Sequence, residues 1–542
     1  MKATPLRLEV TMEALQVVVE RTRAVLSDEE YIQLKKAVET LGYLTQLVED
    51  RKTTIERLRR ILFGATTEKT RNVFEAQRPK PQEADKQSGD LPDESGSDKP
   101  RPGHGRNGIS SYRGAAKVKV SHQCLKAGDP CPECLKGKIY ASLQPGFLVR
   151  VVGQAPLGAT VWELEKLRCN LCGEVFTAEQ PEGVGPEKYD ATSGAMIALL
   201  KYGSGMPFYR LGVLQGSLGI TLPASTQWGI AKEVAAVMEP AFGQLVRQAA
   251  QGEVIYNDDT TAKVLSLMKE RAEADPSSKE RTGVFTSGIV STREGCQIAL
   301  YFTGHKHAGK NLADLLQSRA AELGPPIQMS DALSRNLPKD FEVILANCIA
   351  HGRRRFVDVA PNFPAECRYV IETLAQVYRN DATVRKQAMT PEQRLAFHKE
   401  QSGPLMEGLQ KWFQQQIAER KVEPNSGLGQ AITYFQKHWV KLTRFLHVPG
   451  APLDNNVCER ALKKAILHRK NALFFKTPRG AHVGDVFMSF IHTCHLCGAN
   501  PFDYLTELQR HASDLALRPH EWMPWNYRET LDHLRATRDG PA

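Results

Sequence analysis

The pattern of apolar and polar residues predicts a mixed α/β region in the middle of the chain. β-Branched and aromatic residues flank an acidic pair in 252–265, and two more strand-like runs follow at 282–291 and 296–303. A helical pattern then covers 310–323, and the short apolar run 326–329 has the length of another strand. The order strand, strand, strand, helix, strand is typical of an α/β sheet with a helical cover.

Three carboxylates occupy places in this pattern that suit a functional site. Alternation along the first strand puts Asp258 on one face and Asp259 on the other, so only one of them can join a given site. Asp331 follows the run 326–329, at the carboxyl end of a strand, where α/β sheets expose functional residues. Glu459 is the third acid, and it falls in the first turns of a predicted helix.

Cations follow the third acid along its helix. Asp454 or Asn455 can cap the helix, and Lys463 and Lys470 share the face of Glu459, where they can neutralise phosphate. Carboxylates that converge can bind two Mg²⁺ ions roughly 3.5–4 Å apart, which serve phosphoryl transfer. The three acids therefore predict a nucleic-acid-cutting site. On spacing alone the alternative stays open, because the chain has 61 acidic residues from which three can be chosen.

Two Cys-x-x-Cys pairs precede the first strand. Cys131 and Cys134 form one pair, Cys169 and Cys172 form the other, and strand-like sequence lies between the pairs. Four thiolates with this spacing suit tetrahedral Zn²⁺. We predict a structural zinc ribbon at 121–182 rather than four unpaired buried thiols.

The start of the chain predicts an oligomerisation element and a linker. Apolar residues repeat every seven positions from Leu34 to Leu62, which indicates a coiled coil within 1–75. We favour self-association, as a dimer, over a helix packed on its own domain. The segment 76–120 is rich in Pro, Gly, Ser, Asp and Lys, so it is expected to be a flexible linker.

Helical patterns at 207–218 and 223–234 surround a turn at Gly219. They predict a helix-turn-helix-like domain at 186–248 whose second helix enters the DNA major groove, and generic helical packing has an equal claim. The residues expected to contact DNA are Ser225, Gln227 and Lys232.

The segment from Leu453 to Phe475, with Pro478-Arg-Gly480 after it, closely resembles the glutamate-bearing motif of bacterial insertion-sequence transposases of the TnpC type, the insertion-sequence sixty-six family. That motif is long and specific. Four other segments resemble motifs of the same family, at 189–228, 258–260, 347–356 and 523–526. Two positions depart from the family pattern: Asp259 replaces a glutamate, and no Gly-Tyr pair follows Asp331.

The resemblance implies a DDE transposase with a ribonuclease H-like catalytic core, in which Asp258, Asp331 and Glu459 bind two Mg²⁺ or Mn²⁺ ions. Its expected partners are the terminal inverted repeats of the element, the target DNA, a second copy of the chain and accessory proteins of the same element. The expected fold is multidomain α/β. The catalytic core would occupy 249–352 and 451–512, with a helical insertion at 353–450 and a C-terminal tail at 513–542.

A basic cluster at the end of the strand-like run 341–345 supplies further candidates. His351, Arg353 and Arg354 would bind phosphate or position a metal-bound water, with a core histidine and a solvated basic face as the alternatives.

Composition permits this function without requiring it. The 71 basic and 61 acidic residues give a net charge of +10, which allows DNA binding through local patches. No apolar stretch has the length of a membrane span and the polar start lacks a signal peptide, so we expect a cytoplasmic, nucleoid-associated bacterial protein. Two other functions remain open: a catalytically silent DNA-binding repressor or domesticated factor of the same fold, and a nuclease that cuts without strand transfer.

Overall fold

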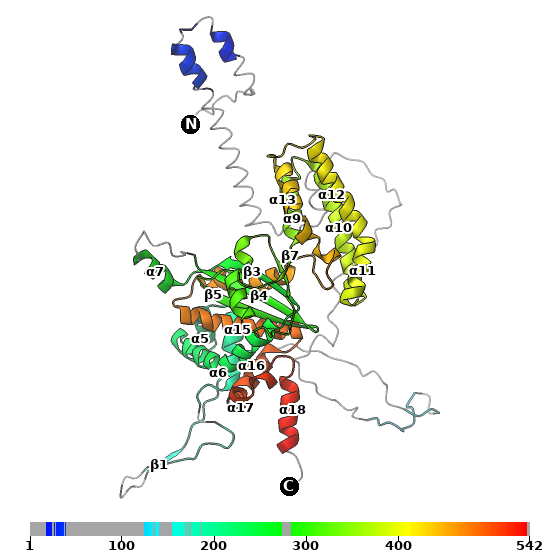
Figure 1. The fold of residues 1–542 in the computed structure, drawn as a ribbon. Coiled ribbons are helices and arrows are strands. Elements are labelled where there is room, and N and C mark those ends of the chain that lie inside the picture. The colour runs from blue at the N-terminus through cyan, green and yellow to red at the C-terminus, as the bar shows by residue number, and fades with distance from the viewer. Residues whose placement is uncertain are drawn as a thin grey trace, which may run out of the picture. The chain divides into compact units, whose positions relative to one another are not determined.

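The structure is a computed structural model of the 542-residue chain (Figure 1). The residues it describes are 187–273 and 283–538, with parts of 18–38, 124–139 and 154–185. Contacts divide the chain into two compact units, Met1–Lys80 with Ala346–Leu453 and Pro81–Leu345 with Asp454–Ala542. Each unit is described by itself.

The second unit is built on a mixed five-stranded sheet with the order β5-β4-β3-β6-β7. The strands are β3 (Val254–Thr261), β4 (Phe285–Arg293), β5 (Cys296–Gly304), β6 (Ile327–Ser330) and β7 (Ile344–Asn347). β3 pairs antiparallel with β4 and parallel with β6. Helix α8 (Ala308–Leu316) lies between β5 and β6 in the chain, as predicted, whereas the short helix between β3 and β4 was not predicted.

Helices cover both faces of this sheet. On one face, Asn311 of α8 donates to the hydroxyl of Ser287 at 2.8 Å. On the other, the Cys458 thiol of α14 (Asn456–Ala472) donates to the carbonyl of Gly288 at 3.2 Å. Because Asp258 pairs with Gly288 and Asp259 with Ser287, the two adjacent acids face different helices, as alternation predicted.

Helix α15 (Pro478–Cys497) runs along β5, the edge strand of the sheet (Figure 1). Backbone N–H groups of β5 donate to side chains of α15, from Thr303 N to Asp485 Oδ2 (2.7 Å), from Tyr301 N to Ser489 Oγ (3.0 Å) and from Ala299 N to Thr493 Oγ1 (3.0 Å). Four helical residues advance about 6 Å and two strand residues about 6.8 Å, so each turn of α15 meets every second residue of β5. The α15 side chains thus accept hydrogen bonds from the backbone N–H groups of β5 that could otherwise pair with another strand.

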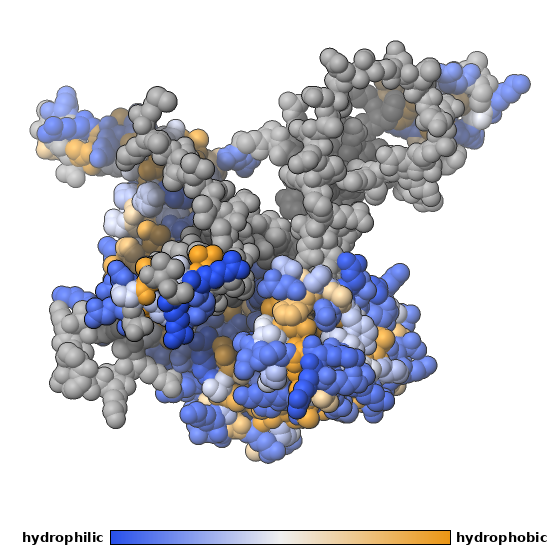
Figure 2. Space-filling view, turned by 90° about the horizontal axis from the view of Figure 1, so that it is seen from above, coloured by the Kyte–Doolittle hydropathy of each residue, from blue (hydrophilic) through white to orange (hydrophobic). Residues whose placement is uncertain are grey.

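Helices before and after the sheet complete this unit. Those before it are α4 (Ala191–Ala198), η2 (Leu199–Gly203), α5 (Phe208–Ser217) and α6 (Ala224–Ala250), and α7 (Leu265–Glu273) follows β3. Gly219, between α5 and α6, has φ +77°, which suits glycine at this turn. The C-terminal helices are α16 (Pro501–Arg510), α17 (Ala512–Leu517) and α18 (Tyr527–Arg538). The surface in Figure 2 is mainly hydrophilic where residues are described.

The other unit contains a helical bundle. Its helices are α9 (Ile349–Val359), α10 (Pro364–Lys386), α11 (Pro391–Gln401), α12 (Gly403–Ala418) and α13 (Gly427–Leu442). The rings of Phe356, Phe413 and Phe435 are 5.4–5.7 Å apart at its centre. Gly352 allows this approach, because a Cβ there would lie 2.5 Å from the Phe435 ring. The helical insertion predicted for 353–450 falls within this unit.

Several expectations fall largely outside the described residues. Of the heptad positions only Leu34 is described, and the linker 76–120 is not. Two short strands, β1 (Lys166–Arg168) and β2 (Val175–Thr177), pair antiparallel around the second cysteine pair, whose Cys169 is not described. Among the helices that are described, none combines the length and apolar character needed to cross a membrane.

Candidate active site

Two of the predicted acids meet just beyond the parallel pairing of β3 and β6, with Asp258 inside β3 and Asp331 directly after β6. Tyr256 of β3 pairs with Met329 of β6, and Asp258 and Asp331 each lie two residues beyond that pair. The side-chain amide of Asn336 donates to Asp331 Oδ1 at 2.5 Å and to Asp258 Oδ1 at 3.4 Å. One amide group therefore bridges the two carboxylates.

Asp258 is electrostatically strained in this position. Burial raises its pKa to about 7, and the negative charges of Asp331 and Asp259 add to the effect. Hydrogen bonds from the Asp259 backbone, at 2.8 Å, and from Asn336 act in the opposite direction. Among the described residues, the groups that shift the pKa of Asp258 most are acids and neutral donors, and none of these is a cation that would favour its ionised form. Two crowded carboxylates are a donor set that fits Mg²⁺ or Mn²⁺.

Asp259 has a histidine and an arginine as partners on the opposite face of β3. His307 Nδ1 lies 2.8 Å from one of its oxygens, and Arg335 lies 3.3 Å from the other. The Phe285 ring packs 4.1 Å from the His307 ring, and only 2% of the Asp259 side chain is exposed. Asp259 is therefore already compensated, and Asp258 is the acid left for a cation.

Helix α14 carries the third acid to the same face as Asp258. Asn455 at its start donates to the Asn257 carbonyl at 3.2 Å, which ties the helix to β3 one residue before Asp258. The next turn places Cys458 in the core, where burial and the charges of Asp258 and Glu459 raise the pKa of its thiol. Glu459 thus lies in the first turn of α14, beside the residue that faces Asp258.

The buried side-chain amides of Asn257 and Gln328 hold Asn336 in place. Asn257 and Gln328 both donate to the Asn336 carbonyl, at 2.8 and 2.6 Å, and Gln328 also donates to Asn257 Oδ1 at 2.9 Å. Gly309 of α8 packs against the same turn, where a Cβ would lie 2.4 Å from the Leu337 carbonyl. The sequence pattern did not single out any of the three amides. For Asn257 and Gln328, a polar residue inside an otherwise apolar strand was the available signal.

The predicted supporting residues lie on two helices. His351, Arg353 and Arg354 belong to α9 of the helical unit, where Arg353 is buried and Arg354 exposed. Lys463 and Lys470 are both exposed on α14, the helix of the third acid.

The predicted DNA-contacting set requires one correction. Gln227 is fully buried, and its amide donates to the carbonyls of Phe208 and Leu222 at 2.9 Å each, so it closes the turn between α5 and α6. Burial and occupied donors remove Gln227 from that set. Ser225 is exposed and Lys232 half-buried on α6.

The fold and the acids define an α/β protein with an acid pair just beyond the parallel pairing of two neighbouring strands. The model of the Transposase IS66 family matches residues 188–483, more than half of the chain, and the chain belongs to this family. The matched range includes all three acids.

Curated proteins of Sinorhizobium fredii are similar to the chain. Uncharacterized protein y4jD is 26% identical over 355 residues, which cover 62% of this chain and 65% of that protein. Uncharacterized protein y4hP is 25% identical over 391 residues, which cover 67% of each. The chain thus spans about two thirds of the length of these relatives, whose names assign no activity.

Proposed function

We propose that the protein is a DNA transposase that cuts the ends of an insertion sequence and joins them to target DNA in a ribonuclease H-like core. Family membership supports transposition as the process. The observation that carries the chemistry is the crowded acid pair, in which Asn336 bridges Asp258 and Asp331 and the described groups that shift the pKa of Asp258 most include no cation. Such perturbed carboxyl pairs are typical of functional sites.

Asp258, Asp331 and Glu459 would hold two Mg²⁺ or Mn²⁺ ions. When bound, such ions activate the attacking oxygen and stabilise the leaving oxygen of an in-line phosphoryl displacement. The chain's own residues prepare that site. Asn336 orients two carboxylates through one amide, and Asn455 fixes the helix that carries the third.

Basic side chains would bind the DNA backbone. Lys463 and Lys470 extend from the helix of Glu459, and Ser225 and Lys232 lie on α6. On α9, His351, Arg353 and Arg354 would serve as a phosphate clamp. Self-association through the N-terminal heptads and help from accessory proteins belong to the same proposal.

The zinc ribbon is a further part of the proposal. Around the first cysteine pair, Cys131 N donates to the Gly137 carbonyl at 2.8 Å, and Pro130 and Lys138 form an antiparallel bridge. Around the second, β1 and β2 pair up to Arg168 and Val175. A tight turn between short antiparallel segments is the setting that a zinc knuckle needs. We expect one bound zinc, lost in Cys131→Ser; stoichiometric zinc in that variant would contradict the ribbon.

The test is cleavage of labelled DNA that carries candidate element ends, taken from the DNA flanking the coding sequence, with Mg²⁺ or Mn²⁺. Wild type should cut and join, and Asp258→Ala, Asp331→Ala and Glu459→Ala should bind the ends without cutting. Cutting that survives Asp331→Ala would place the second acid elsewhere. Specific binding without cutting by wild type would favour a repressor, and cutting without joined products would favour a nuclease.

A further inference from the structure

The helix of the third acid ends in a strained turn that exposes two apolar side chains. Leu473 has φ +67° and ψ −46°, and Phe474 N donates to the Ala472 carbonyl at 2.8 Å, which closes a three-residue γ-turn. This conformation is rare for a residue with a side chain. Leu473 is 61% and Phe474 39% exposed, so the burial of these side chains does not fully offset the strain energy of the turn. Strain that packing leaves uncompensated is characteristic of ligand-binding segments.

The residues around the turn hold it rigidly. Phe475 N donates to the Lys263 carbonyl at 2.8 Å, and Leu265 N donates to the Phe475 carbonyl at 2.9 Å. The Phe475 ring stacks on the buried His468 ring, 4.6 Å away and inclined by 13°. Phe475 is therefore the anchor, and the two residues before it are presented at the surface.

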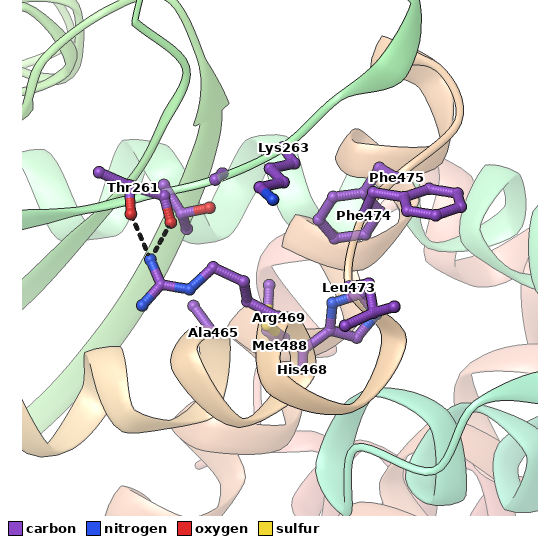
Figure 3. A pocket seen from close by; sticks show the side chains of 11 residues that line it. Thr261, Lys263, Ala465, His468, Arg469, Leu473, Phe474, Phe475 and Met488 are labelled. Atoms are coloured by element: carbon purple, nitrogen blue, oxygen red, sulfur yellow. Dashed lines mark hydrogen bonds between the residues drawn. The ribbon is translucent and has the colours of Figure 1, made fainter. Parts of the chain in front are cut away.

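Helix α14 is also fixed to β3 close to this turn. Arg469 Nη1 donates to Thr260 Oγ1 at 3.1 Å, to Thr261 Oγ1 at 2.5 Å and to the Thr261 carbonyl. Figure 3 shows Arg469 reaching Thr261 on one side of a small pocket, whose lining also includes Lys263, Leu473 and Phe474. The strained turn is thus tied to the strand that carries the first acid.

The charge around the turn points to DNA as the ligand. From Arg460 to Gly484 the chain has seven Lys or Arg residues and no acid. The exposed cations near the turn are Lys263, Lys470, Lys476 and Arg479, and none has an ion-pair partner among the residues that the structure describes. An apolar tip within a basic surface matches a duplex, because cations contact phosphates while the tip contacts bases.

We infer that Leu473 and Phe474 form a wedge that inserts between base pairs of the bound element end and unstacks them. The inference rests on the proposed function and adds a second DNA contact to the same helix. Leu473 follows Glu459 by 14 residues along α14, or about 21 Å at the helical rise. That length corresponds to roughly six base pairs at 3.4 Å each, so unstacking is expected about four to eight base pairs from the cut.

The experiment uses the full chain and element-end duplexes with 2-aminopurine at single positions from about two to ten base pairs from the cut, in EDTA. Because an unstacked 2-aminopurine is no longer quenched, wild type should raise its fluorescence severalfold at one or two adjacent positions. Leu473→Ala and Phe474→Ala should each remove most of that rise and weaken binding about 5- to 20-fold. Leu517→Ala is the matched control, since Leu517 is 80% exposed on α17.

A stability readout separates a wedge from a structural residue. Glycine accepts the positive φ, so Leu473→Gly should keep or raise Tm while it loses the fluorescence signal. If wild type binds and cuts the ends but no position brightens, or if Leu473→Gly brightens like wild type, the wedge is overturned and the transposase proposal stands. Failure of wild type to bind or cut any end would overturn both.

Discussion

The buried carboxyl groups of Asp258 and Asp485 have similarly raised pKa values but different neighbours. The pKa of Asp258 is raised to about 7 by burial and by neighbouring acids. Burial alone raises the pKa of Asp485 to about 7, while hydrogen bonds from the backbone and hydroxyl of Thr303, both 2.7 Å, favour its charged form. Asp485 has protein donors for both of its oxygens. In Asp258 both donors, the Asp259 backbone and the Asn336 amide that it shares with Asp331, reach the same oxygen, Oδ1.

The comparison shows that an altered pKa by itself does not identify a catalytic group. Asp485 belongs to the row of α15 side chains that covers the edge of β5, so its burial serves the fold. Asp258 is buried beside like charge, an arrangement that costs stability unless a cation joins it. We therefore assign a catalytic role to Asp258, whose charge is incompletely compensated, and a structural role to Asp485, whose charge is compensated.

The largest expected difference between the two groups is in activity. Asp258→Asn should lower end cleavage about a thousandfold or more, because a metal-binding carboxylate is lost. Asp485→Asn should cut within about threefold of wild type, since its side chain contacts β5 rather than the acid pair. Single-turnover cleavage with Mg²⁺ measures both. Equal losses of cleavage in the two variants would contradict the assignment of a catalytic role to Asp258 alone.

The next difference is in the pH dependence of stability. A carboxyl whose pKa is raised in the folded state stabilises the fold fully below its ordinary pKa, near 4, and loses that contribution as pH rises through about 7. Asp485→Asn should therefore match wild type near pH 4 and exceed it by roughly 2–4 kcal/mol at pH 8. Tm measured from pH 4 to pH 8 provides the check. A gain that does not depend on pH would contradict the assignment.

A smaller effect tests the amide that bridges the acids. Asn336→Ala should lower cleavage about 10- to 100-fold and raise the Mg²⁺ concentration needed for half-maximal rate, because the carboxylates lose their orientation. Asn311→Ala is the matched control, since Asn311 is also buried but bonds Ser287 on α8's face of the sheet. A shift in Mg²⁺ dependence in both variants would indicate general loosening of the sheet.

The smallest effect concerns the edge of the sheet. Thr493→Val leaves the Ala299 N–H without its acceptor and should cost about 1–2 kcal/mol, seen as a lower Tm with unchanged cleavage. Thr373→Val removes an exposed hydroxyl bonded within α10 and should change little. Similar Tm values for the two variants would show that the row of side chains on α15 contributes nothing to stability.

Local sequence pattern was sufficient for the succession of strands along the chain and for the opposite directions of Asp258 and Asp259, because periodicity determines both. It also placed Asp331 after a strand and Glu459 in the first turns of a helix. It missed Asn336, which bonds residues up to 79 positions away, because local pattern carries no information on such pairs. Gln227 was misread for a related reason: its partners are backbone carbonyls, which are independent of side-chain identity.

The row of polar side chains on α15 also affects folding during synthesis of the chain. Ala299 and Thr493 are 194 residues apart, so a ribosome adding about 5–20 residues per second completes α15 roughly 10–40 s after β5. During that interval the outer edge of β5 lacks its cover, and the helix of Glu459 emerges only shortly before α15 does. The nascent chain therefore gains its third acid and its edge protection almost together, and until then the edge of β5 is open to strand pairing between copies.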